Sequence, residues 1–246
     1  MKRRKFNQLM LSSGIASSFF PSEVWLNKKE KFEYLLGKAN SHLFNFGNFQ
    51  LEKQSLQAFL KMKEAALKDQ IHIEIVSAFR SFKRQKEIFE NKYKQFQTHS
   101  NSTLEIINQI TTYSSIPGTS RHHWGTDIDI IQAEVDAPKS DWLEEENYLK
   151  HGAFAQLYNW MQANAHKFGF FEAYPNNHKQ RKGYLFEPWH YSYQPKAKIY
   201  LQTYLENNLI QKIKKENLVG LNELEPGFFK NYQDQFILGI NQQLIP

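Results

Sequence analysis

The spacing of apolar residues in the first half of the chain predicts two amphipathic helices with a strand between them. Residues 55–70, SLQAFLKMKEAALKDQ, carry apolar side chains at helical intervals, which is typical of a helix with one buried face. Residues 71–79, IHIEIVSAF, alternate apolar and polar side chains and therefore predict a half-buried strand. Residues 81–96 predict a second helix, because Ser81 is a favourable N-cap residue ahead of the apolar repeat.

The second half alternates again between predicted helices and strands. Residues 98–119 are rich in Ser, Thr and Asn, which indicates that part of this stretch is a loop. The remaining predicted elements are a buried strand at 128–132, a helix at 151–169 that ends at Gly169, a strand at 183–193 and a helix at 195–217 that begins at Pro195. Short strands interspersed with helices predict an α+β fold, in which a small antiparallel sheet is flanked by helices.

The composition of the chain argues against a nucleic-acid partner and excludes sites that depend on cysteine. The chain has 246 residues, 41% of them hydrophobic, which is enough for one globular core. Four of the six net positive charges come from residues 2–5, so the rest of the chain carries only +2 and no nucleic-acid partner is expected. The chain has no cysteine, which excludes disulfides, a thiol nucleophile and a Cys-ligated metal. A metal site must therefore use His, Asp or Glu.

The first 25 residues have the layout of an export signal. A basic start is followed by a moderately apolar stretch of small residues, and no acidic residue precedes Glu23. Arg3 and Arg4, followed by Lys5 and Phe6, resemble a twin-arginine signal, which would export the protein to the periplasm or cell envelope. The apolar stretch is too short and polar to predict a stable membrane span. A disordered basic tail is the alternative interpretation.

The residues that could bind a metal or take part in catalysis are concentrated in two short stretches of the sequence. Residues 120–129 read SRHHWGTDID, in which His122 and Asp129 are separated by a turn at Gly125. Sixty-one residues after Asp129 lies His190, with Glu187 three residues before it. Two imidazoles and one carboxylate are the ligand set of a catalytic zinc site, and a second carboxylate would remain to act as a general base. On spacing alone, a chance arrangement is an open alternative.

The residues around these positions carry a family resemblance. SRHHWGTDID resembles the S-x-H-x-x-G-x-A-x-D motif of the VanY-type D-alanyl-D-alanine carboxypeptidases, which are zinc peptidases related to the D-Ala-D-Ala dipeptidases and the hedgehog N-terminal domain. FEPWHY resembles the E-x-x-W-H motif of that family, and residues 77–85, SAFRSFKRQ, resemble its S-G-Y-R-S-x-x-x-Q segment. The three motifs occur in the family's order and extend over roughly half of the chain.

The resemblance implies a hedgehog/D-Ala-D-Ala peptidase-like fold and a role for each matching residue. It implies one Zn²⁺ per chain held by His122, Asp129 and His190. It also implies Glu187 as the catalytic base and Arg80 as a catalytic and substrate-binding cation that faces the substrate carbonyl. Gln85 and Ser120 match positions that line the substrate pocket.

The chain also departs from the family motifs at several positions. Asp127 stands where the motif has Ala, and Asp129 is preferred as the ligand because it keeps the motif spacing. Ala78 and Phe79 replace the usual Gly and Tyr. His123 is adjacent to a ligand but off the motif, so it is expected to support the site or lie on the surface.

These observations give an expected domain organisation and function. We expect an export signal at 1–25, a catalytic domain at 26–216 and a C-terminal extension at 217–246. The expected activity is removal of the terminal D-Ala from peptidoglycan stem peptides by a zinc-dependent D,D-carboxypeptidase. The alternatives are an L,D-carboxypeptidase or endopeptidase of the same family, or a non-catalytic zinc-bearing module that binds the cell wall. A two-His, one-carboxylate Fe(II) oxygenase is disfavoured because its usual His-x-Asp spacing is absent. The sequence leaves the oligomeric state open.

Overall fold

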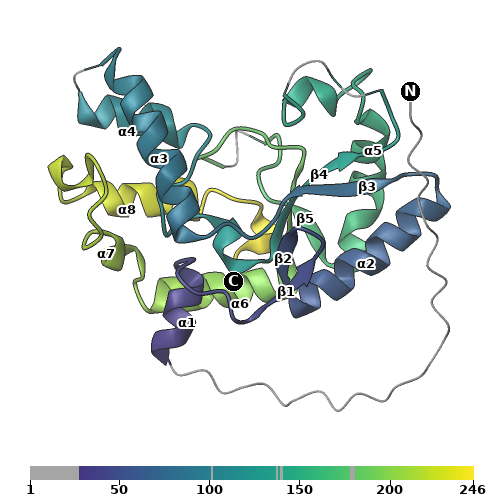
Figure 1. Ribbon diagram of the computed structural model, residues 1–246, viewed down its shortest axis with the longest axis horizontal. Helices are drawn as coiled ribbons and strands as arrows, with labels where there is room; N and C mark the ends of the chain where they lie inside the picture. The colour runs from purple at the N-terminus through teal and green to yellow at the C-terminus, as the bar shows by residue number, and fades with distance from the viewer. Residues whose placement is uncertain (1–27, 101, 137, 139–140, 178–180) are drawn as a thin grey trace, which may run out of the picture.

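The computed structural model describes residues 28–100, 102–136, 138, 141–177 and 181–246 (Figure 1). The export signal predicted at 1–25 lies outside the described residues, so it stays a prediction. Within the described ranges, no helix has both the length and the apolar character needed to cross a membrane.

Four strands of the described chain form an antiparallel sheet in the order β3 (Ile73–Ser77), β4 (Asp127–Gln132), β6 (His190–Tyr193) and β5 (Phe170–Glu172). A separate hairpin pairs β1 (Leu43–Phe46) with β2 (Phe49–Glu52). The predicted α+β class with a small antiparallel sheet is therefore confirmed.

In Figure 1, α2 and α5 lie beside the sheet on the right, whereas α3, α4, α7 and α8 lie farther away on the left. The helices are α1 (Lys28–Leu35), α2 (Lys53–Lys68), α3 (Phe82–Gln97), α4 (Thr103–Thr111), α5 (Ala155–Asn164), α6 (Gln194–Glu206), α7 (Ile210–Ile213) and α8 (Phe228–Tyr232). Shorter turns are η1 (Arg121–Trp124), η2 (Glu145–Asn147), η3 (Ala165–Phe168), η4 (Leu221–Glu223), the π-helical η5 (Gln233–Ile237) and η6 (Gln242–Leu244).

The hydrophobic core lies in two main clusters. One cluster fills the space between the sheet and helices α2 and α5, and it includes Phe59, Ile128, Ile130 and Leu157. Side chains alternate between the two faces of a strand, so Asp127 and Asp129 of β4 point to the opposite face. The second cluster joins α1, α3, α4 and α6 with the C-terminal segment. The acidic face of β4 is thus directed away from the sheet core.

Most of the predicted elements are present with small shifts at their ends. The helix predicted at 55–70 is α2, the strand predicted within 71–79 is β3, and the strand predicted at 128–132 is β4. The hydroxyl of Ser81 accepts a hydrogen bond from the backbone N–H of Arg84, so the predicted N-cap of α3 is confirmed. The helix predicted at 151–169 begins only at Ala155 as α5, which ends at Asn164, and the 3₁₀ turn η3 continues it to Gly169, which has a left-handed φ of 79°.

Three stretches differ from the prediction. Residues 98–119 contain helix α4, which buries Ile106, Ile107 and Ile110 and is too short to give a long apolar repeat. The strand predicted at 183–193 is present only from His190, because the Arg181 guanidinium donates to the backbone carbonyls of Tyr184 and Leu185. The helix predicted at 195–217 stops at Glu206, two residues before Asn208 adopts a left-handed φ of 47°.

The segment 217–246 packs into the same core as α3 and α4. Leu218, Phe229 and Leu244 are all buried in the helical cluster. The buried hydroxyl of Tyr232 accepts a hydrogen bond from the backbone N–H of Ile116 and lies 3.0 Å from the hydroxyl of Thr119. This segment therefore supports the loop that leads into the histidine pair at 122–123.

Candidate active site

The strand register brings the three predicted metal ligands together. Asp129 of β4 stands opposite His190, the first residue of β6, while His122 lies in η1 just before β4. The His122 Nε2 atom is 3.3 Å from Asp129 Oδ2, and His190 Nδ1 is 3.8 Å from Asp129 Oδ1. Gly125 ends η1 with a left-handed φ of 68°, which allows the chain to turn into β4.

The cluster fits a tetrahedral zinc ion. Two ligands about 2.0–2.1 Å from zinc lie roughly 3.3 Å apart at a tetrahedral angle, close to the distances seen here. One potential ligand atom from each of His122, Asp129 and His190 lies within 4.8 Å of the others, and all three residues are buried. The Oδ1 atom of Asp129 is buried and has no hydrogen-bond partner among the described residues. A buried carboxylate oxygen without a donor is expected where a cation binds.

The neighbours of each imidazole determine which nitrogen is left for a metal. Nδ1 of His122 lies 2.7 Å from the backbone carbonyl of Ala78, which can only accept, so Nδ1 carries the proton and Nε2 faces Asp129. Nε2 of His190 donates to Oδ1 of Asp127 at 3.1 Å, so its Nδ1 faces Asp129. The nitrogens left for a metal are therefore Nε2 of His122 and Nδ1 of His190, and the latter would first give up the proton that it donates to Glu187 Oε2 at 2.8 Å.

Electrostatics also favour a cation at this point. Burial alone would raise the pKa of Asp129, but the neighbouring His122 and His190 outweigh it and lower that pKa to about 2. Burial opposes a charged imidazole at His190, yet its hydrogen bonds to Asp127 and Glu187 raise the pKa of His190 to about 10. A proton on His190 thus balances the buried carboxylates, and a metal ion bound at this point would take over that role.

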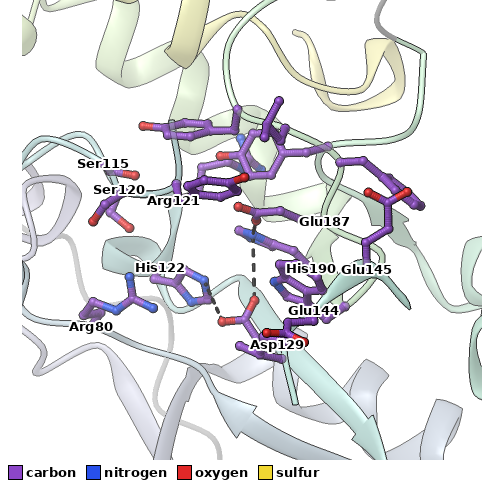
Figure 2. Close-up of a pocket in the computed structure, with 18 of the residues that line it drawn as sticks. Arg80, Ser115, Ser120, Arg121, His122, Asp129, Glu144, Glu145, Glu187 and His190 are labelled. Carbon is purple, nitrogen blue, oxygen red and sulfur yellow. Dashed lines mark hydrogen bonds and ion pairs between the residues drawn. The ribbon is translucent and has the colours of Figure 1, made fainter. Parts of the chain in front are cut away.

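Glu187 lies beside the three ligands. Its Oε2 atom is 2.8 Å from His190 Nδ1, and its side chain is 13% exposed and lines the cavity above the cluster. A tight turn positions it, because the backbone N–H of His190 donates to the Glu187 carbonyl. Figure 2 shows its carboxylate above the His190 ring, on the open side of the cluster.

The backbone of Arg80 forms hydrogen bonds with both His122 and His123. Its N–H donates to the carbonyl of His122, and its own carbonyl accepts the Nδ1–H of His123. The guanidinium donates to Gln85 Oε1 at 3.0 Å and to Ser77 Oγ at 3.2 Å, and it lines the cavity. His123 is fully buried, so it supports the site and does not lie on the surface.

The two remaining candidate residues occupy different positions. Ser120 is buried and lines the cavity beside His122. Gln85 is fully buried behind Arg80, where its amide donates to the Ser115 carbonyl at 2.7 Å and accepts from Arg80. Gln85 therefore contacts the wall residues and does not itself border the cavity.

The cluster opens into a cavity of about 660 Å³ with walls of opposite charge. Arg80 and Lys92 contribute cations, whereas Glu144, Glu145 and Glu146 contribute carboxylates. In Figure 2, Arg80 lies to the left of His122, Asp129 and His190, and Glu145 lies to their right. Burial, with the charge of Arg80 nearby, lowers the pKa of Lys92. The cavity can therefore orient a ligand that carries a negative charge at one end.

Sequence reasoning did not identify several residues of this site. Lys92 lies seven residues after Gln85 on α3, and only the helical repeat could have placed it on the same side. Asp127 was noticed as a departure from the motif, but no pattern in the sequence shows that it contacts His190. The acidic wall at 144–146 lies outside the three motifs altogether.

Comparison with known proteins identifies related sequences. Residues 48–196 match the sequence model of a family described as "VanY: D-alanyl-D-alanine carboxypeptidase". The chain is 28% identical over 142 residues to a D-alanyl-D-alanine carboxypeptidase of Enterococcus faecalis, with 56% of this chain and 47% of the relative covered. It is 35% identical over 111 residues to an uncharacterized protein of Haemophilus influenzae, with 44% and 83% covered. The chain thus spans about half the length of the Enterococcus relative.

The fold of this chain is also found in a solved structure of a related protein. The structure of VanYB in complex with D-Alanine-D-Alanine matches with a TM-score of 0.50 and 24% sequence identity. The match covers 68% of this chain and 87% of that chain. The peptidase-like fold expected from the motifs is therefore confirmed.

Proposed function

This chain belongs to the VanY family of D-alanyl-D-alanine carboxypeptidases, as its three motifs predicted, and on that premise we propose that it is a zinc-dependent D,D-carboxypeptidase. The proposed substrate is a peptidoglycan stem peptide, from which the enzyme removes the terminal D-Ala. The observation that carries the proposal is the buried cluster of His122, Asp129 and His190, with Glu187 beside it in a cavity.

His122 Nε2, Asp129 and His190 Nδ1 would hold the zinc ion. Zinc bound there supplies a Lewis acid that lowers the pKa of a water ligand to about 7 and polarises a carbonyl. The chain's own residues supply orientation and proton transfer. With three protein ligands, a zinc ion would keep a coordination position for water or substrate.

Glu187 is the proposed general base. Its carboxylate takes a proton from the attacking water, whose oxygen bonds to the carbonyl carbon of the scissile amide. The carbon–nitrogen bond then breaks, and the same proton passes from Glu187 to the departing amine of D-Ala. Water is consumed, and the products are the shortened peptide and one free amino acid.

Arg80 is the proposed electrophilic group. Gln85 and Ser77 each accept one of its five guanidinium N–H groups, and the remaining donors can stabilise the negative charge that develops on the carbonyl oxygen. Since the Arg80 backbone is bonded to His122 and His123, this cation is held in a fixed position relative to the metal ligands.

Lys92 supports a carboxypeptidase over an endopeptidase. Burial and, after it, the charge of Arg80 lower the pKa of the half-buried Lys92 ammonium, the charge of Glu187 offsets this only in part, and Lys92 forms no hydrogen bond or ion pair with the described residues. The free carboxylate of a terminal D-Ala would relieve this repulsion. A substrate that continues beyond the scissile bond has no such charge at that place.

Glu187 and Arg80, which match the proposed catalytic residues of the family, both line the cavity. Their presence favours a catalytic function over that of a module that only binds the cell wall. Incubation of the protein with a disaccharide pentapeptide, a disaccharide tetrapeptide and a cross-linked dimer, followed by mass spectrometry, tests the substrate. We expect loss of one alanine from the pentapeptide. Cleavage of the cross-linked dimer alone would support an endopeptidase instead. Cleavage of the tetrapeptide alone would support an L,D-carboxypeptidase, and binding without turnover would support a non-catalytic module that binds the cell wall.

Export through residues 1–25 and a catalytic unit that begins at about residue 26 are also part of the proposal. A cell-envelope location suits a peptidoglycan substrate. Replacement of both Arg3 and Arg4 by Lys should retain the protein in the cytoplasm, as measured by cell fractionation. Unchanged export of that variant would contradict the twin-arginine assignment.

A further inference from the structure

We propose that Asp127, with Arg121, is a positioning pair that holds His190 as a metal ligand. The inference rests on the metal site of the proposed function, but it does not depend on the identity of the substrate. Asp127 occupies the position at which the family motif carries Ala, so the resemblance assigns it no role.

Both carboxylate oxygens of Asp127 already accept hydrogen bonds. Its Oδ1 atom accepts from Arg121 Nε at 2.9 Å and from His190 Nε2 at 3.1 Å. Its Oδ2 atom accepts from the hydroxyls of Thr126 at 2.6 Å and Ser192 at 2.9 Å. The residue is 0% exposed. These contacts make Asp127 an acceptor for a ligand and exclude it as a ligand itself.

The register of β4 and β6 places Asp127 next to the proposed metal ligands. Asp127 pairs with Ser192, and Asp129 pairs with His190. The two aspartates are two residues apart on one strand, so their side chains lie next to each other on the same face of β4. The His190 ring reaches both of them, with Nδ1 toward Asp129 and Nε2 toward Asp127. Asp129 would thus bind the same metal ion as His190, whereas Asp127 accepts a hydrogen bond from the opposite side of the ring.

Arg121 compensates the charge of the buried Asp127 carboxylate. Its side chain is 5% exposed, its Nη2 donates to Ser192 Oγ at 2.6 Å, and its guanidinium stacks 4.9 Å from the Trp124 ring. The pair is therefore neutral as a unit and is fixed by packing. A buried charge that loses its partner is strongly destabilising, whereas removal of both charges is often tolerated.

The expected effect follows from this geometry. A carboxylate that accepts the second N–H of a ligating imidazole fixes its tautomer and orientation and raises its basicity, and loss of such a partner typically weakens metal binding about 10–100-fold. Asp127 should therefore raise zinc affinity by this factor over a chain that lacks it.

The test measures zinc dissociation constants by competition with a chelator, on protein whose fold is checked by circular dichroism. Asp127→Asn keeps the shape of the side chain, and the double variant Arg121→Met/Asp127→Ala removes both charges together. We expect about 10–100-fold weaker zinc binding in each. Asp69→Asn is the matched control, because Asp69 also accepts a ring N–H, from Trp160, and it should bind zinc as the wild type does.

The outcomes separate this inference from the proposed function. Failure of the wild type to bind zinc would overturn both. Wild-type zinc affinity in the Asp127 variants would overturn the positioning role alone. A measurement on the wild type needs no variant to fold: ¹⁵N spectra of the histidines in the zinc-loaded protein should show His190 protonated at Nε2. Protonation at Nδ1 would contradict the proposal.

Discussion

Asp129 and His190 are directly paired in the antiparallel register of β4 and β6, so one pair of backbone positions fixes two of the three proposed zinc ligands. Neither side chain needs a flexible loop to reach the other. A site held by strands keeps its geometry when the surrounding loops move. The third ligand, His122, is brought to them by the turn at Gly125.

Glu187→Gln should separate proton transfer from metal binding. The amide keeps the shape of the side chain but cannot accept a proton, so kcat should fall by about 10²–10⁴. KM should change little, because the lost interaction belongs mainly to the transition state. Steady-state kinetics on a pentapeptide, with zinc content measured on the same samples, checks this. A variant that loses its zinc would show instead that Glu187 is a ligand.

Lys92→Met should raise KM for substrates with a free terminal carboxylate by roughly tenfold, about 1.4 kcal/mol of binding, with a smaller effect on kcat. The physical reason is the loss of a half-buried cation from the cavity wall. Lys94→Met is the control, since Lys94 lies two residues farther along α3 and is exposed. Equal KM values for the two variants would remove Lys92 from the substrate site.

Tyr232→Phe should lower the free energy of unfolding by about 1–3 kcal/mol, because the buried N–H of Ile116 loses its acceptor. Urea denaturation measures the change, and Tyr113→Phe at an exposed position should have little effect. An unchanged stability of the Tyr232 variant would mean that segment 217–246 does not support the loop before Ser120.

Glu172→Gln should change how stability depends on pH. Burial raises the pKa of Glu172 from its usual value near 4.5 to about 7, and the hydrogen bonds from Gln162 and Tyr158 offset only part of this. The folded state therefore favours the neutral acid. The contribution of the neutral Glu172 side chain to the free energy of unfolding is complete below about pH 4.5, and it is lost as the pH rises through about 7.

The Gln variant, which stays neutral, should be more stable than the wild type at pH 8 by up to about 3 kcal/mol and nearly equal to it at pH 4.5. Denaturation at several pH values tests this, and Glu74→Gln at an exposed strand position serves as the control. A difference that does not vary with pH would show that Glu172 ionises normally.

The sequence predicted the parts of this protein that depend on local pattern. The alternation in 71–79 predicted β3, and the motif spacing predicted that His122, Asp129 and His190 meet. The sequence could not predict α4, because its nine residues give only two turns of apolar repeat. It also could not predict the loop at 183–189, because this loop is held by hydrogen bonds from Arg181, which belongs to no apolar repeat. The contacts of Asp127 likewise depend on strand register, which no single segment encodes.

The most direct test of the central claim is metal-dependent removal of the terminal D-Ala by the purified protein. The protein is stripped of metal with a chelator, one equivalent of zinc is returned, and a disaccharide pentapeptide is followed by mass spectrometry before and after, with Asp129→Ala in parallel. We predict no cleavage without metal, restored release of one alanine with zinc, and no restoration in the Asp129 variant. Cleavage that persists in the metal-free protein, or none with zinc bound, would contradict the account.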